Sequence, residues 1–126
     1  MKMRLVVLLL GACIATGSLA AKLPDSAIAP GQKALVKLLK GNTLNGEWAG
    51  RPFRQHFSES GSTKYKDGNG SVSLGIWRVN ASGQYCSVWP PSSREVCYDV
   101  LVDGMDVYWK SGGEIYFSTV SIGDRF

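Results

Sequence analysis

The sequence predicts a mainly β protein: a small antiparallel up-and-down barrel, or a curled meander sheet, of about seven to eight strands with one short N-terminal helix. From residue 43 onward, short runs of β-branched and aromatic residues alternate with turn residues, and no window has helical periodicity. The connections are too short for the crossover helices that parallel strands need, so neighbouring strands must run antiparallel.

Residues 1–20 are interpreted as an export signal. Lys2 and Arg4 supply a basic start, an apolar run follows, and the small residues that end at Ala20 form a cleavage site. The apolar stretch is shorter than the ~20 residues that a membrane-spanning helix needs. The protein is therefore expected in the periplasm or outside the cell.

A second processing route centres on Cys13. Residues 9–13 have the form of a bacterial lipoprotein box, in which this cysteine becomes the acylated N-terminus. Cleavage after Ala20 removes Cys13, whereas lipidation makes it a membrane anchor. The sequence leaves both routes open, and membrane contact is expected only for the lipidated form.

A lead-in and one helix come before the β region. Residues 21–30 are small, polar and Pro-containing, and they are expected to be flexible and loosely held. Residues 32–40 have leucine and valine on one face and lysine on another, which predicts a short amphipathic helix that docks on the sheet. Gly41 and Asn42 end this helix.

The β region contains eight strand-like segments. They are residues 43–48, 53–58, 63–66, 72–79, 84–89, 94–102, 106–110 and 114–122. The intervening residues are mostly Gly, Pro, Asn, Asp and Ser, which favour tight turns. Residues 31–126 are therefore expected to form a single disulfide-linked β domain.

Two cysteines of the β region are expected to close a hairpin. Cys86 and Cys97 lie in neighbouring strands that residues 90–93, with the sequence PPSS, connect. A four-residue loop places Cys86 opposite Cys97 and Tyr85 opposite Tyr98, so the disulfide crosses the hairpin directly. The closed loop of about a dozen residues contributes on the order of 3 kcal/mol. Two cysteines and one distant histidine do not form a metal-ligand set, so no metal is expected.

The charge balance disfavours a strongly electrostatic partner. The chain carries 14 Lys and Arg against 10 Asp and Glu, a formal charge of +4. Loss of Lys2 and Arg4 with the leader leaves twelve basic against ten acidic residues. Acidic residues are also mixed through the aromatic half, unlike a basic stacking surface for nucleic acid. No nucleic-acid partner is expected.

Aromatic residues are the candidates for a binding surface. Most of them pack in the core of so small a barrel, but an aromatic lining with an arginine at its mouth would hold a small apolar or anionic ligand. The hairpin register also predicts a cation–π contact between Trp89 and Arg94. The binding candidates are Trp77, Arg78, Tyr85, Trp89, Arg94, Tyr98 and Trp109.

No catalytic residue, cofactor or enzymatic activity is predicted. His56, the sole histidine, has no recognisable serine or cysteine nucleophile motif near it in the sequence. In an alternating strand it shares a face with Arg54 and Ser58, which predicts a position on the solvent side.

The order Gly75-x-Trp77, Tyr85-Cys86, Trp89 and Cys97-Tyr98 resembles small exported proteins of alphaproteobacteria of the DUF995-like kind, a group of unknown function. In that group a Gly-x-Trp strand precedes a Cys…Trp…Cys hairpin. The resemblance covers about residues 43–117. It implies a periplasmic or secreted β domain, and it implies no activity and no catalytic residue.

Two functions are consistent with these features. The first is a non-enzymatic β-barrel module that binds an unknown small ligand or an envelope protein through the face of Tyr85, Trp89, Arg94 and Tyr98. The second is an inhibitor of a secreted hydrolase such as lysozyme, with the loops at residues 66–71 and 90–93 entering the enzyme's cleft.

Overall fold

The computed structural model describes residues 22–126, so the predicted leader and Cys13 lie outside the described residues. After the lead-in, the described chain forms helix α1 (Gln32–Leu39) and then eight strands. The strands are β1 (Thr43–Trp48), β2 (Arg51–Phe57), β3 (Ser62–Asp67), β4 (Val72–Val79), β5 (Tyr85–Val88), β6 (Glu95–Asp103), β7 (Asp106–Ser111) and β8 (Glu114–Ser121).

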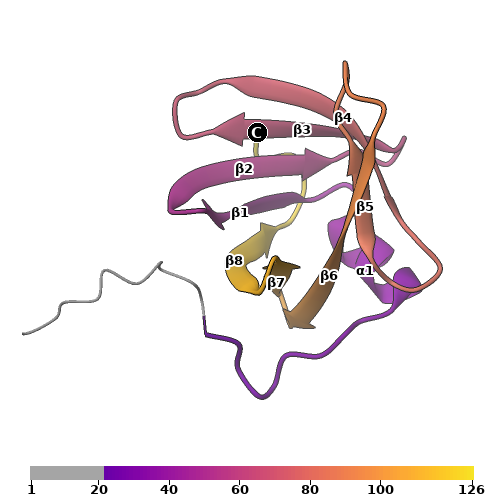
Figure 1. Cartoon of the computed structure of the whole chain (residues 1–126), viewed down its shortest axis with the longest axis vertical. Coiled ribbons are helices and arrows are strands. Elements are labelled where there is room, and N and C mark those ends of the chain that lie inside the picture. The colour runs from indigo at the N-terminus through magenta and orange to yellow at the C-terminus, as the bar shows by residue number, and fades with distance from the viewer. Residues whose placement is uncertain (1–21) are drawn as a thin grey trace, which may run out of the picture.

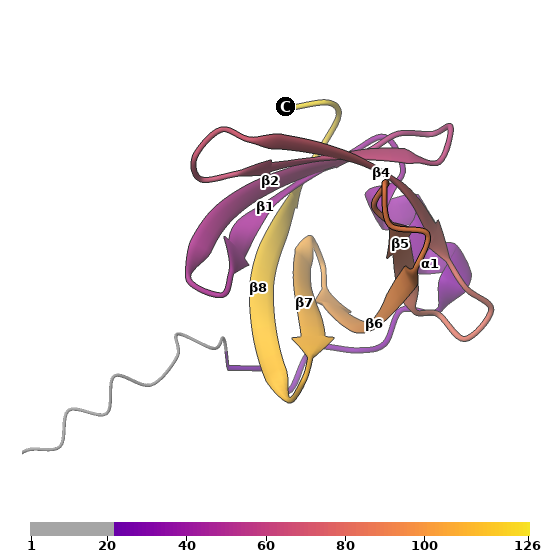
Figure 2. The same ribbon diagram turned by 45° about the horizontal axis from the view of Figure 1, so that its top comes forward.

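The strands form a closed antiparallel barrel in the order of the sequence. Each strand pairs with the next, and β8 returns to pair with β1 through Thr43 opposite Ser121. Figure 2 shows the strands arranged as a ring. The predicted up-and-down barrel is confirmed, and of the two arrangements left open the closed one forms. Closure pairs both edge strands of the meander and leaves no open sheet edge.

Helix α1 docks on the sheet, as its amphipathic pattern predicts, and it closes one end of the barrel. Leu35 and Leu39 are fully buried in the core, and the lysines of the opposite face are exposed. Gln32 Nε2 donates to the backbone oxygen of Val79 at 3.0 Å, which fixes the helix on β4. Figure 1 shows α1 beside β5. The turns that join β2 to β3 and β4 to β5 lie at this closed end.

The expected β5–β6 hairpin register is confirmed. Tyr85 pairs with Tyr98, and Cys86 pairs with Cys97 and is joined to it by a disulfide. A disulfide of this kind indicates a non-reducing, extracytoplasmic environment. Within residues 22–126, no helix has the length and hydropathy of a membrane span.

The lead-in corrects one expectation. Ile28 and Val102 form an antiparallel bridge with two backbone hydrogen bonds of 2.9 and 2.8 Å. Ser26 Oγ also donates to Asp103 Oδ2 at 2.6 Å. The lead-in is therefore not loosely held at this point, because it adds a pair of ladder bonds to β6.

The C-terminal residues 122–126 cross the outside of β1 and β2 and correct a second expectation. Thr43 Oγ1 donates to Gly123 O at 2.8 Å and accepts from the Arg125 N–H at 2.9 Å. His56 lies on the outer face with Arg54, as alternation predicts. It is nevertheless only 9% exposed, because this segment covers it.

Candidate functional site

A cavity of about 300 Å³ lies inside the barrel at the end opposite α1. Alternate residues of the strands point into it, because side chains of a strand alternate between the two faces. Seven aromatic side chains form most of its wall: Trp48, Phe53, Tyr65, Tyr85, Trp89, Tyr98 and Trp109. Charged side chains do not contribute to the lining that the described residues provide.

The aromatic rings contact one another around the wall. Phe53 stacks on Tyr65 with ring centroids 5.3 Å apart, and Tyr65 meets Trp89 edge-on at 6.1 Å. On the other side, Trp48 contacts Tyr98 at 5.4 Å. Such ring pairs stabilise one another beyond their area burial, so they form a firm apolar wall.

A small polar group interrupts this wall on the inner side. Gln55 Nε2 donates to Tyr85 Oη and Thr63 Oγ1, each at 3.0 Å. Ser87 also hydrogen-bonds with Tyr85 and lines the cavity. Burial raises the pKa of Tyr85, although its hydrogen bonds with Ser87 and Gln55 act in the opposite direction. The phenol is therefore neutral at physiological pH and presents a hydrogen-bonding group beside the cavity.

Two glycines make room for this arrangement. A Cβ at Gly75 would lie 2.7 Å from Cε3 of Trp89, and a Cβ at Gly46 would lie 2.4 Å from the backbone oxygen of Phe117. Each glycine precedes a tryptophan by two residues, so both members of the Gly-x-Trp pair face inward. The glycine at 75 allows the Trp89 ring to lie flat against β4.

The structure brings four of the seven binding candidates together. Tyr85, Trp89, Tyr98 and Trp109 all line the cavity. Trp77 also points inward, but it packs in the core against Phe57 and donates its indole N–H to Ser58 O at 3.0 Å. Its role is packing, because it does not reach the cavity.

The two arginine candidates lie away from the cavity. Arg78 points outward and forms a bidentate pair with Glu95, in which Nε donates to Oε2 at 2.8 Å. Arg94 is exposed beyond the end of β5–β6 and does not line the cavity. The indole N–H of Trp89 donates to Ser87 Oγ at 3.0 Å. Among the described residues the cation–π contact joins Lys64 to Phe126, so the expected Trp89–Arg94 contact is wrong.

Several cavity residues were not among the sequence candidates. They are Trp48, Phe53, Gln55, Tyr65, Ser73, Ser87 and Pro90. Alternation in β2 places Phe53 and Gln55 on one face, which was an available signal. How deep each residue lies in the barrel depends on the stagger between strands, and the sequence does not display that stagger.

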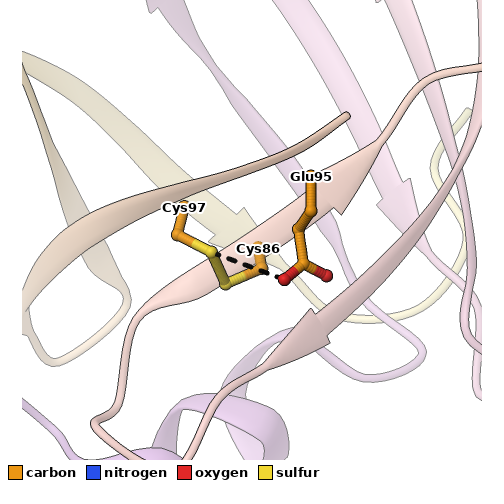
Figure 3. Close-up of side chains that lie close together, drawn as sticks. All are labelled: Cys86, Glu95 and Cys97. Carbon is orange, nitrogen blue, oxygen red and sulfur yellow. Dashed lines mark hydrogen bonds between the residues drawn. A yellow bond between two sulfur atoms is a disulfide. The ribbon is translucent and has the colours of Figure 1, made fainter. Parts of the chain in front are cut away.

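Cys86, Glu95 and Cys97 gather on the outer face, where Figure 3 shows the two sulfurs joined. A metal needs a thiolate, and a disulfide sulfur has neither the charge nor a proton to donate. The 3.8 Å approach of Cys97 Sγ to Glu95 Oε1 is therefore a contact only. The hydrogen bond from Arg78 lowers the pKa of Glu95 and keeps it a carboxylate.

The surroundings of His56 do not have the geometry of a catalytic relay. Its Nδ1 lies 3.3 Å from Thr43 Oγ1 and 3.9 Å from Asp124 Oδ1. In a relay the acid and the nucleophile contact opposite ring nitrogens, whereas here both partners face the same nitrogen. Thr43 already donates its proton to Gly123 O, so this cluster fastens the C-terminal segment.

The cavity, with its aromatic wall and neutral polar group, is the feature on which a function can be argued. Comparison with family models, curated proteins and solved structures finds no match for this chain.

Proposed function

We propose that this protein is a non-enzymatic β-barrel module, exported to the periplasm or outside the cell, that binds one small neutral molecule. The observation that carries this proposal is the aromatic cavity of about 300 Å³ at the open end of the barrel. Eight-stranded barrels are just wide enough to hold one small ligand. The volume is at the lower end of the range for ligand sites, which favours a compact molecule.

The lining defines the chemistry of this ligand. A charged molecule would lose its hydration without gaining an ionic partner, because the described lining contains no charged side chain. Aromatic walls favour a flat or apolar body. Gln55 and Tyr85 favour a hydroxyl or carbonyl group at its inner end. The ligand is therefore a neutral, mainly apolar compound with one polar group.

The proposed location rests on the disulfide together with the predicted leader. Cleavage after Ala20 gives a released protein, and lipidation of Cys13 gives a tethered one. Mass spectrometry of the N-terminal peptide of the exported protein distinguishes the two forms by the presence of an acyl chain.

Binding is tested with the neutral fluorescent probe N-phenyl-1-naphthylamine. Trp48, Trp89 and Trp109 line the cavity, so a bound probe receives energy from tryptophan. Ser73 also lines the cavity, and in Ser73→Trp the larger ring takes up part of the volume that the probe would occupy. We expect saturable binding by the natural sequence and at least about tenfold weaker binding by Ser73→Trp.

The matched control is Ser62→Trp, which adds the same ring on the exposed outer side of β3. It should bind the probe as the natural sequence does. No saturable binding, or equal binding by both tryptophan variants, would show that the cavity is not a ligand site.

A second pair of variants tests whether the probe binds in the cavity or on the face that the sequence predicted, which includes Arg94. Trp89→Ala removes part of the wall, and Arg94→Ala removes an exposed side chain outside it. We expect weaker probe binding for Trp89→Ala and unchanged binding for Arg94→Ala. An equal loss of probe binding in both variants would show that Arg94 contributes to the binding site.

Inhibition of a secreted hydrolase is the second candidate. The β3–β4 and β5–β6 connections are exposed and lie at the same end of the barrel, where two loops have access to one cleft. A lysozyme assay with the purified protein tests this candidate. Inhibition that Ser73→Trp does not reduce would favour the loops over the cavity.

A further inference from the structure

Strand β4 carries an exposed apolar stripe on the outside of the barrel. Val72, Leu74 and Ile76 are 51%, 64% and 59% exposed. They alternate with Ser73, which lines the cavity, and with Gly75, which is buried. Outward positions of a soluble sheet are normally polar, so three successive apolar residues there indicate contact with another surface.

The stripe has cations along one side. Lys66 is the cross-strand neighbour of Val72, and Lys64 is the neighbour of Leu74. Arg54 on β2 is the cross-strand neighbour of Lys66, on the side of β3 away from β4. The nearby acid Asp67 accepts hydrogen bonds from the backbone N–H groups of Asn69 and Ser71, within its own turn.

The other side of the stripe is closer to neutral. Val88 is the cross-strand neighbour of Ile76, which extends the apolar surface onto β5. Arg78, the next outward residue of β4, is paired with Glu95. The face as a whole therefore combines a short apolar line with the positive charges of Lys64 and Lys66. The ammonium of Lys64 lies 5.2 Å from the centre of the Phe126 ring, a contact that leaves its charge in place.

A second copy of this chain is a poor occupant. Three alternate residues of a strand span only about 13 Å, whereas a stable interface buries about 800 Å² on each partner. A second copy of the face would supply apolar side chains, but it would bring lysines of its own and not an acidic surface for Lys64 and Lys66. An anionic surface satisfies both the apolar stripe and its cations.

We propose that the outer face of β4 docks on an anionic phospholipid bilayer. Val72, Leu74 and Ile76 enter the boundary between headgroups and acyl chains, and Lys64 and Lys66 contact lipid phosphates. Few apolar side chains and two lysines give weak, reversible binding. This docking is independent of the proposed ligand. It places one wall of the cavity against the membrane, because Ser73 lines the cavity from the inner face of the same strand.

The test is co-sedimentation of the protein with vesicles of phosphatidylcholine alone or mixed with phosphatidylglycerol. Val72, Leu74 and Ile76 are replaced together by threonine, which keeps the strand propensity of these positions. Ile28→Thr is the matched control, since Ile28 is 64% exposed and lies in the lead-in. All variants carry the same N-terminus, so any effect of the leader or a lipid is common to them.

The natural sequence and Ile28→Thr should bind the mixed vesicles equally. The triple variant should bind at least about tenfold less well. Replacing Lys64 and Lys66 by glutamine should weaken binding by about fivefold for each lysine, and added salt should weaken it further. Leu74→Thr alone serves as a second variant if the triple variant does not fold.

Three results would overturn the proposal. The first is no preference of the natural sequence for the anionic vesicles, and the second is equal binding by the triple variant. The third is a dimer in sedimentation velocity that the triple variant converts to a monomer, which would identify a second copy as the occupant.

Discussion

Tyr85 connects the cavity to the core at the scale of a single residue. Its ring packs edge-on against Phe57 and Trp109, and its hydroxyl is bonded to Gln55. Its burial makes ionisation unfavourable, which raises its pKa above the ordinary value of 10.0. The stability of the fold must therefore depend on pH in the alkaline range.

The sign of this dependence follows from proton binding. Below about pH 10 both the folded and unfolded states hold the phenolic proton, so the full stability is present. Above that pH the unfolded state releases the proton while the folded state keeps it. Tyr85 thus contributes a fall in unfolding free energy of up to about 1.4 kcal/mol per pH unit until its folded pKa is reached.

Tyr85→Phe should reduce this alkaline slope. Urea unfolding at about pH 9 and about pH 11 measures it in both proteins. Some slope should remain, because burial also raises the pKa of Tyr65 and of Tyr98. At neutral pH the variant should lose about 1–3 kcal/mol, since Gln55 loses a partner. An unchanged alkaline slope would contradict the prediction.

Residue positions were partly predictable. Neighbours in a strand face opposite sides, so Trp77 and Arg78 cannot both line one cavity, and this information is in the sequence. The sequence does not distinguish Trp77 in the core from Trp89 in the wall. Both face inward, and the difference between them is their height in the barrel.

The β5–β6 hairpin is the element whose register was predicted most completely. Its four-residue connection and its cysteine pair agree on a single register, and both are local in sequence. The bridge between Ile28 and Val102 has no such local signal. It joins segments that are distant in the chain, and a single pair of backbone bonds leaves no sequence pattern.

Replacing Cys86 and Cys97 together by alanine should lower the unfolding free energy by about 3 kcal/mol. The disulfide, with a sequence separation of 11, restricts the unfolded chain, and the double variant loses that restriction. Urea unfolding of the variant, of the natural sequence and of the reduced natural sequence measures this effect. The variant and the reduced protein should agree, and a difference of less than about 1 kcal/mol from the oxidised protein would contradict the prediction.

Closure of the barrel is a property of the whole molecule. The sequence predicted the strands and their antiparallel order but left a barrel and a curled sheet open. The distinction depends on whether β8 reaches β1, and no local pattern reports that contact. The position of residues 122–126 over His56 was unpredictable for the same reason, since it depends on contacts with Thr43, which is distant in the sequence.

Leu39→Ala tests how much the closed end contributes to the whole fold. Leu39 is fully buried in the core beneath the barrel end, so its truncation leaves a void. We expect a loss of about 2–5 kcal/mol in unfolding free energy. Lys37→Ala on the exposed side of α1 is the control and should change stability little. Similar values for the two variants would mean that α1 does not seal the barrel.

The seal that α1 provides also has a kinetic consequence. With Leu35 and Leu39 fully buried at one end, the described chain leaves the opposite rim as the route into the cavity. A ligand of the proposed kind would then leave along the path by which it entered, so its binding and its dissociation would cross the same barrier. Narrowing that rim slows both rates by the same factor and leaves the equilibrium constant unchanged. On the proposed function, the rim would therefore set the residence time of the ligand, and the contacts with the cavity wall would set its affinity.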